Sequence, residues 1–148
     1  MDYLIITTEA LKPGFEPLLK WKTRKGVIAE LITLEEITST YPDPGIQLKI
    51  KRCLYDYYTR RNLKWALLGG DHDVIPIQTC YTKIDLNGDE FIDGTIPTDL
   101  FYACFDNRFD WNSTQDDKIG EIYWDHNDIL PEISVSRIPV NTPEHVKT

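Results

Sequence analysis

The chain has 148 residues, of which 41% are hydrophobic and 27% are charged, values typical of one globular domain. The formal net charge is −8, and it is unevenly distributed. Residues 1–80 carry 11 Lys and Arg against 10 Asp and Glu, whereas residues 81–148 carry 5 against 14, and 12 of those 14 acids lie between Asp85 and Asp128. Such a chain repels nucleic acids and anionic membranes, and it suits cations or basic peptides.

No apolar run approaches the ~20 residues that cross a bilayer. The N-terminus, Met-Asp-Tyr-Leu-Ile-Ile-Thr-Thr, lacks the basic segment of a signal peptide, so we expect either a cytoplasmic protein or one whose leader has been removed. The cysteines, Cys53, Cys80 and Cys104, show no CxxC spacing, which argues against zinc and against a disulfide framework. We expect Cys53 in a core, and a pairing of Cys80 with Cys104 stays open.

The first third of the chain alternates predicted strands and helices. Tyr3–Thr7 and Val27–Ile32 are short β-rich apolar runs typical of buried strands. Between them, Pro13-Gly14 opens a predicted helix with a basic last turn, and Gly26 ends it. Thr33 and Glu36 have the spacing of a capping box for a short helix over 34–40.

A longer helix is predicted from Asp43-Pro44, with Asp43 as N-cap and Pro44 as first helical residue. Its apolar stripe consists of Ile46, Ile50, Cys53, Leu54, Tyr57 and Tyr58. Trp65–Leu68 is predicted as a third buried strand. Residues 1–76 therefore predict a βαβαβ core with right-handed crossovers, hence a mainly parallel sheet with helices on both faces, a three-layer α/β fold of the flavodoxin or caspase kind.

Residues 77–130 predict an acidic insertion. Ile77–Ile84 and Phe91-Ile92 flank Asn87-Gly88, a strong hairpin signal, so we expect a β-hairpin appended to the sheet. A loop over 106–128 follows, and within 131–140 the run Ile133–Pro139 predicts a last core strand. A helix signal at Pro143 leads us to expect that the native chain continues beyond Thr148, so that residues 1–148 are one α/β subdomain of a larger protein.

The run Ala66-Leu-Leu-Gly-Gly-Asp-His-Asp73 places ionisable groups after a buried strand. Ligands of open parallel sheets bind outside the carboxyl ends of the strands, and a His between carboxylates can act as a general base. The alternative is a turn in which Asp71 binds backbone N–H groups and His72 is solvated. No Ser or Cys nucleophile is near in sequence, and we expect no catalytic role for His72.

Two segments are candidate calcium sites. Asp85, Asn87, Asp89 and Asp93 match positions 1, 3, 5 and 9 of an EF-hand loop, but Glu90 stands where the loop needs Gly and Ile96 where it needs Glu. The alternative is a hairpin tip with solvated acids. Residues 106–121 have oxygen donors at irregular spacing, which calcium accepts, although a disordered surface loop is the plainer interpretation. The sequence contains neither a phosphate-binding loop nor a GxGxxG motif, so we expect no nucleotide or flavin.

Several motifs, in order along the chain, resemble the N-terminal half of the gingipain-type cysteine peptidase domain. They are Tyr3–Thr7, Leu18-Leu-Lys-Trp-Lys22, Lys25-Gly26, Thr33-Leu-Glu-Glu-Ile37, Ala66-Leu-Leu-Gly-Gly-Asp71, Ile75-Pro76, Pro97-Thr-Asp-Leu-Phe-Tyr102, Pro131–Val140 and Thr142-Pro-Glu144. The match covers almost the whole chain, and Ser136 departs from it because the family usually has Gly there.

The resemblance implies a caspase-like fold and a Cys–His catalytic pair that comes later than the Arg-Ile-Pro strand. None of Cys53, Cys80, Cys104, His72, His126 and His145 matches that pair by context. The resemblance thus implies that this chain is an inactive first subdomain whose partner is the catalytic subdomain. Asp71, His72 and Asp99 would then lie at the edge of the active site. Peptide substrates would bind through the parent protein. The family's calcium binding and export are further expectations.

Two other hypotheses remain at this stage. The chain could be a non-enzymatic module whose acidic face binds basic peptides or a protein partner. It could also be a signalling domain of the receiver or flavodoxin kind, although Asp71 lies two glycines late for a receiver and the early acid pair is missing.

Overall fold

The structure is a computed structural model that describes residues 1–85, 91–106, 109–121, 124–127 and 129–146, except for the side chains of 83–85 and 91–93. The strands are β1 (Tyr3–Thr7), β2 (Ala29–Thr33), β3 (Trp65–Gly69), β4 (Gln78–Asp85), β5 (Phe91–Thr98) and β6 (Ser134–Ile138). The helices are α1 (Lys12–Arg24), α2 (Leu34–Thr40) and α3 (Ile46–Arg61), with 3₁₀ turns η1 (Leu100–Tyr102) and η2 (Pro143–Val146). Among the described residues, no helix has the length and apolar character needed to span a membrane.

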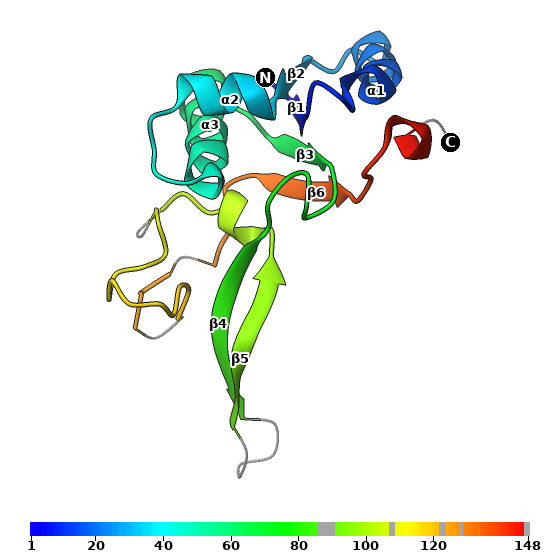
Figure 1. Cartoon of the computed structure of the whole chain (residues 1–148). Coiled ribbons are helices and arrows are strands. Elements are labelled where there is room, and N and C mark those ends of the chain that lie inside the picture. Colours follow the sequence, from blue (N-terminus) through cyan, green and yellow to red (C-terminus); the bar gives the residue numbers. More distant parts are fainter. Residues whose placement is uncertain (86–90, 107–108, 122–123, 128, 147–148) are drawn as a thin grey trace.

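Four strands form a parallel sheet in the order β2-β1-β3-β6 (Figure 1). Tyr3 of β1 lies opposite Ala29 of β2 and Trp65 of β3, and Trp65 lies opposite Ser134 of β6. Because all four strands run in one direction, their carboxyl ends meet at one edge of the sheet. The prediction of a mainly parallel α/β sheet is confirmed.

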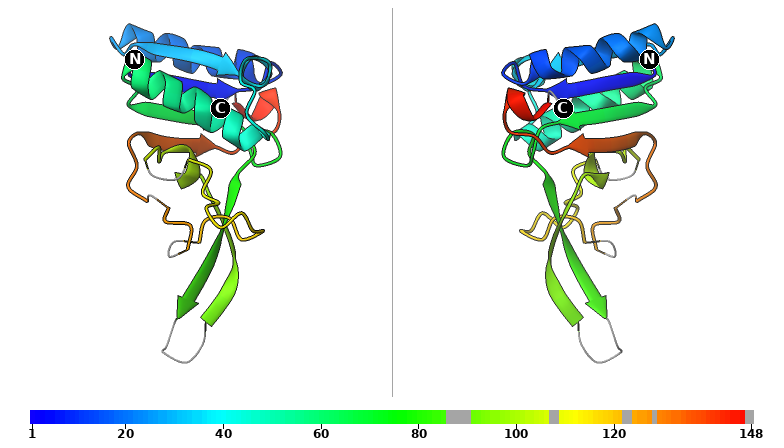
Figure 2. Two further views of the ribbon diagram at one scale, coloured as in Figure 1. Left: turned by 90° about the vertical axis from the view of Figure 1, so that its left-hand side faces the viewer. Right: turned by 90° about the vertical axis from the view of Figure 1, so that its right-hand side faces the viewer.

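The two faces of the sheet are covered by different helices, as the side-chain period of two requires. Leu4 and Leu68 pack in a large core cluster with Leu54 of α3, whereas Ile5 and Leu67 pack in a second cluster with Phe15 of α1. Figure 2 shows α3 in front of the sheet from one side and α1 from the other. The three predicted layers are therefore present.

Helix starts show where local signals suffice and where they fail. The capping box before α2 is formed: Thr33 Oγ1 accepts a hydrogen bond from the Glu36 N–H, and the Glu36 carboxylate accepts one from the Thr33 N–H at 2.8 Å. The predicted start of α3 at Asp43-Pro44 is wrong. The helix begins at Ile46 after Gly45, whose φ is +78°, and the Asp43 carboxylate instead accepts a hydrogen bond from Arg52 at 3.2 Å.

The predicted hairpin is present. Strands β4 and β5 pair antiparallel from Gln78↔Thr98 to Asp85↔Phe91, but they form a sheet of their own that projects away from the body (Figure 1). The prediction of an appended hairpin is confirmed, and β4 and β5 pair only with each other among the described strands. Strand β6 differs from expectation, because it lies at the edge of the parallel sheet, and Ser134, Ser136 and Ile138 are exposed where a core strand was predicted.

Candidate functional site

Strand β3 ends at two glycines that the surrounding packing requires. A Cβ on Gly69 would lie 2.6 Å from Phe15 Cζ, and a Cβ on Gly70 would lie 2.8 Å from the side chains of Val74 and Ile75. Both glycines therefore allow the chain to pass close to neighbouring side chains as it leaves the sheet. Thr7 at the end of β1 donates a hydrogen bond to the Gly69 carbonyl at 2.7 Å, which holds the two strand ends together.

His72 lies between two carboxylates in the turn that follows, residues 71–74, which we call the His72 turn. The nearest Asp71 oxygen is 3.1 Å from His72 Nδ1, and the nearest Asp73 oxygen is 3.3 Å from Nε2. The hydrogen bond with Asp71, and then the charge of Asp73, raise the pKa of His72 above its ordinary value. The His72 N–H donates to the Asp71 carboxylate at 2.8 Å, and this bond lowers the pKa of Asp71.

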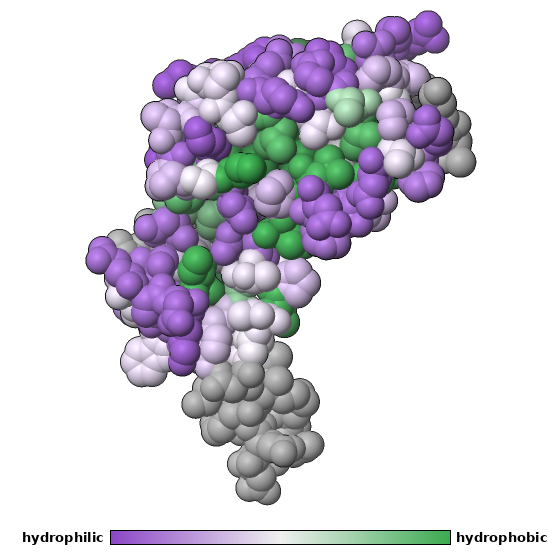
Figure 3. Space-filling model, viewed as in Figure 1, coloured by the Kyte–Doolittle hydropathy of each residue, from purple (hydrophilic) through white to green (hydrophobic). Residues whose placement is uncertain are grey.

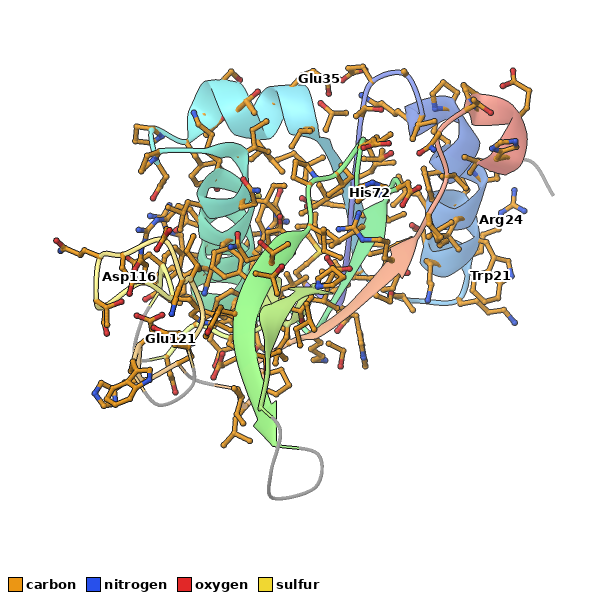
Figure 4. All side chains as sticks on the ribbon, turned by 60° about the horizontal axis from the view of Figure 1, so that its bottom comes forward. Trp21, Arg24, Glu35, His72, Asp116 and Glu121 are labelled. Carbon is orange, nitrogen blue, oxygen red and sulfur yellow. The ribbon has the colours of Figure 1, made fainter. Side chains whose placement is uncertain are left out.

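The His72 side chain is 61% exposed, so the turn presents an imidazole with a strengthened affinity for protons at the carboxyl edge of the sheet. Figure 4 shows His72 well apart from Asp116 and Glu121, which belong to the loop over residues 106–128, called the acidic loop below. Figure 3, seen from the side toward which the strands run, shows hydrophobic residues gathered in the middle of this edge and bordered by hydrophilic ones. Both features of a binding edge, an apolar floor and a few ionisable groups, are therefore present there.

Asp99, the third predicted residue of this edge, is engaged by Arg137 of β6. The guanidinium Nε and Nη2 donate to the two Asp99 carboxylate oxygens at 2.8 and 2.7 Å. Nη1 donates to the carbonyls of Gly70 and Ile75 at 2.8 and 2.7 Å. The structure thus brings Asp99 and the His72 turn together through one side chain, which sequence reasoning did not single out.

The three cysteines are all buried, and no disulfide joins them. Burial raises the pKa of Cys53 to about 12 and that of Cys80 to about 11. A thiol with these properties is protonated near neutral pH and is hidden from substrates. Cys53 is a core residue, as predicted, and the alternative pairing of Cys80 with Cys104 is not formed.

The calcium prediction falls mostly outside the structure. Asn87 and Asp89 lie outside the described residues, and Asp85 and Asp93 lie on β4 and β5 where side chains are not described. In the described ranges, no group of three or more His, Cys, Asp or Glu side chains is arranged to hold a metal. The ligand set of Asp85, Asn87, Asp89 and Asp93 stays a prediction.

Asp125 organises the acidic loop, and sequence reasoning missed it. Its fully buried carboxylate accepts hydrogen bonds from the N–H groups of Thr114, Gly120 and Glu121 at 3.0–3.1 Å and from the Thr114 hydroxyl at 3.1 Å. Burial alone would raise the pKa of Asp125, but these hydrogen bonds outweigh burial and lower it. The described part of the loop is therefore folded rather than disordered. The oxygen donors of this loop are irregularly spaced in the sequence, so no pattern indicated the role of Asp125.

Lys51 is a second missed residue, fully buried on the inner side of α3. Its ammonium lies over the rings of Phe101, Phe109 and Trp111, with the nitrogen 4.2, 4.9 and 5.2 Å from the ring centroids. Aromatic faces attract a cation, most strongly where water is excluded. The lysine thus joins α3 to η1 and to the acidic loop.

Comparisons with known proteins identify the family of the chain and solved structures with a similar fold. Residues 1–148 match the sequence model described as "Peptidase family C25". Among solved structures, the fold is similar to a chain described as "Structure of Protease", with a TM-score of 0.65 and 20% identity over 99% of this chain. It is also similar to a chain of the complex of Porphyromonas gingivalis RgpB pro- and mature domains, with a TM-score of 0.63 and 21% identity over the whole chain.

A third similar structure is the dimeric latent PorU of Porphyromonas gingivalis, with a TM-score of 0.66 and 15% identity over 98% of this chain. The chain spans 26%, 27% and 14% of the lengths of these three proteins, and at such identities they show the fold alone. A search of curated proteins found no match. Because the family match extends over every residue, the resemblance seen in the sequence motifs is confirmed: the chain belongs to peptidase family C25.

Proposed function

We propose that residues 1–148 are the N-terminal subdomain of a gingipain-like cysteine endopeptidase and support a catalytic half that carries the Cys and the His. The observation that carries the proposal is the contrast between a family match over all 148 residues and three cysteines that are all buried. A peptidase of this class needs an accessible thiolate. The nucleophile then comes from another part of the protein, and export with removal of a leader belongs to the same proposal.

The edge of β6 supports a partner subdomain. Ser134 N–H donates to the Lys64 carbonyl, and the Ile138 carbonyl accepts from Gly70 N–H, so these two residues direct their backbone groups toward β3. Alternate residues of a strand point these groups in opposite directions, so Val135 and Arg137 direct theirs away from β3. Across the described ranges β6 pairs with β3 alone, and parallel sheets are normally covered and continued.

Peptidase assays test the proposal. The purified 148-residue chain is expected not to hydrolyse Arg- or Lys-ester substrates, whereas the longer protein that contains it is expected to do so. Turnover by the 148 residues alone that disappears on changing one of Cys53, Cys80 or Cys104 would overturn the division of roles. A longer protein with no thiol-dependent turnover would overturn the peptidase assignment itself.

We also propose that the hairpin tip holds Ca²⁺, because Asp85, Asn87, Asp89 and Asp93 supply oxygen donors at EF-hand spacing. Thermal melting of the chain with EDTA and with millimolar Ca²⁺ tests this. At 100 times its Kd a ligand adds roughly 2.7 kcal/mol, which shifts the midpoint by several degrees. The shift should be absent in Asp89→Asn. A midpoint that Ca²⁺ leaves unchanged in the original chain argues against the site.

A further inference from the structure

Five carbonyl oxygens in the segment from Gly69 to Pro76 accept hydrogen bonds, namely those of Gly69, Gly70, Asp71, Ile75 and Pro76. Thr7 donates to Gly69 O, and Tyr102 Oη donates to Pro76 O. The N–H groups of Val74 and Ile75 donate to Asp71 O at 2.9 and 2.8 Å. Arg137 donates to the other two carbonyls in this set, those of Gly70 and Ile75.

These last two carbonyls flank the His72 turn, one immediately before it and one immediately after. A single guanidinium nitrogen, Arg137 Nη1, therefore fixes both ends of the turn. The other two donors face the Asp99 carboxylate, which sets the plane of the guanidinium. The Arg137 side chain is 12% exposed and that of Asp99 is 21% exposed, so the pair is largely shielded from water.

His72 and Asp73 of the turn are exposed and Asp71 is half-buried, in contrast with this shielded support. His72 faces Asp71 and Asp73 of the same turn, and Arg137 is the charged group that approaches it from β6. An exposed imidazole on a turn whose two ends are held by hydrogen bonds from Arg137 is the arrangement that a site needs when its groups must keep one geometry.

We infer that Arg137 is a positioning residue that fixes the His72 turn at the active-site edge, with Asp99 as the anchor of its guanidinium. The description of this edge as part of an active site rests on the proposed function, whereas the positioning itself does not. Asp99 then acts on the turn through Arg137 and does not itself face a substrate.

Arg137→Lys separates positioning from charge, because lysine keeps the positive charge but cannot reach two carboxylate oxygens and two carbonyls together. The pKa of His72 is measured by NMR titration of the imidazole signals. The chain has three histidines, and the signal that is missing in His72→Gln is the one that belongs to His72. The pKa of His72 is expected to fall toward the free value of about 6.5. Amide hydrogen exchange at Val74 and Ile75 is expected to become about tenfold faster.

Asp99→Asn provides a milder variant that keeps both carbonyl bonds, and smaller changes in the same directions are expected. Arg52→Lys breaks the distant contact with Asp43 and should leave His72, Val74 and Ile75 as they are. If Arg137→Lys lowers only the melting temperature and leaves the His72 titration and both amides unchanged, the inference is wrong. If that variant does not fold, an unchanged His72 in Asp99→Asn overturns it. No substrate enters these measurements, so failure of the proposed peptidase function would not alter them.

Discussion

Single buried charges organise the irregular parts of this chain. Asp125 gathers four donors from the acidic loop, and Lys51 lies over three aromatic rings that reach α3 from η1 and the same loop. Arg137 connects β6 to the turn after β3 and to Asp99. A buried charge is stable only where its partners are in place, so each of these residues specifies the conformation of the segments around it.

Asp125→Asn tests this at one residue. The substitution keeps the size of the side chain. It replaces one carboxylate oxygen, which accepts hydrogen bonds, with an NH₂ group that faces N–H donors and cannot accept from them. We expect a loss of about 1–3 kcal/mol in urea unfolding, since hydrogen bonds to a charged group are lost. Asp117→Asn is the matched control, because it makes the same change in the same loop at an exposed side chain. Equal stabilities of the two variants would contradict the role of Asp125.

The same substitution has a predicted pH dependence. Because the folded pKa of Asp125 is lowered, its contribution to stability is fully present above the unfolded value of about 3.9. The contribution is lost as the pH falls through the folded pKa. The stability difference between the original chain and Asp125→Asn should therefore shrink below about pH 4, which unfolding curves at pH 3 and pH 6 would check.

At the scale of elements, periodicity and capping signals predicted most of the regular structure. The buried strands and the box at Thr33 and Glu36 follow from local physics. The predicted start of α3 was wrong because the Asp43 side chain accepts a hydrogen bond from Arg52, nine residues away, and does not cap the helix. A local capping rule does not take such a partner into account. The His72 turn was placed correctly at the sheet edge, but the role of Arg137 depends on partners 38 to 67 residues away. Such contacts carry no spacing signal in a sequence.

The packing of α1 on the sheet gives a prediction at this scale. A methyl group at Gly69 would lie 2.6 Å from Cζ of the buried Phe15 ring, so Gly69→Ala must displace the ring or the strand. Overpacking of this kind costs about 1–3 kcal/mol, which thermal or urea unfolding would detect.

Phe15→Leu shortens the obstructing side chain and supplies the rescue. The double variant should be more stable than the sum of the two single losses implies, since the clash is removed. Gly94→Ala is the control, because nothing lies within 4 Å of the added methyl group. Additive losses in the double variant would show that Phe15 does not limit the size of residue 69.

The whole molecule is an α/β body with a projecting hairpin (Figure 2). The side chains of the edge strand β6 alternate between exposed and half-buried. Fold class and family could be predicted from the order of the strands, helices and motifs. The projection of the hairpin could not, because it depends on whether β4 finds a partner in the parallel sheet or only in β5. Among the described strands β6 pairs with β3 alone, and we propose that the other side of β6 contacts the catalytic half.

Val135→Pro tests that link. The Val135 N–H points away from β3, so proline removes no hydrogen bond from the sheet described here, and edge strands accept proline at such positions. We expect the 148-residue chain to melt close to the Val135→Ala control, which keeps the N–H but has a smaller side chain. Ser136→Pro, whose lost N–H faces β3, should melt at a clearly lower temperature.

In the longer protein the order of effects should change. If a strand of the catalytic half pairs with β6, Val135→Pro removes a hydrogen bond between the subdomains and should lower peptidase turnover and the melting temperature well below those of Val135→Ala. Equal behaviour of the two Val135 variants there would mean that no strand continues the sheet at this edge. If Val135→Pro destabilises the 148-residue chain as much as Ser136→Pro, the direction assigned to the Val135 backbone groups is wrong, and the side of β6 proposed to contact the catalytic half must be reassigned.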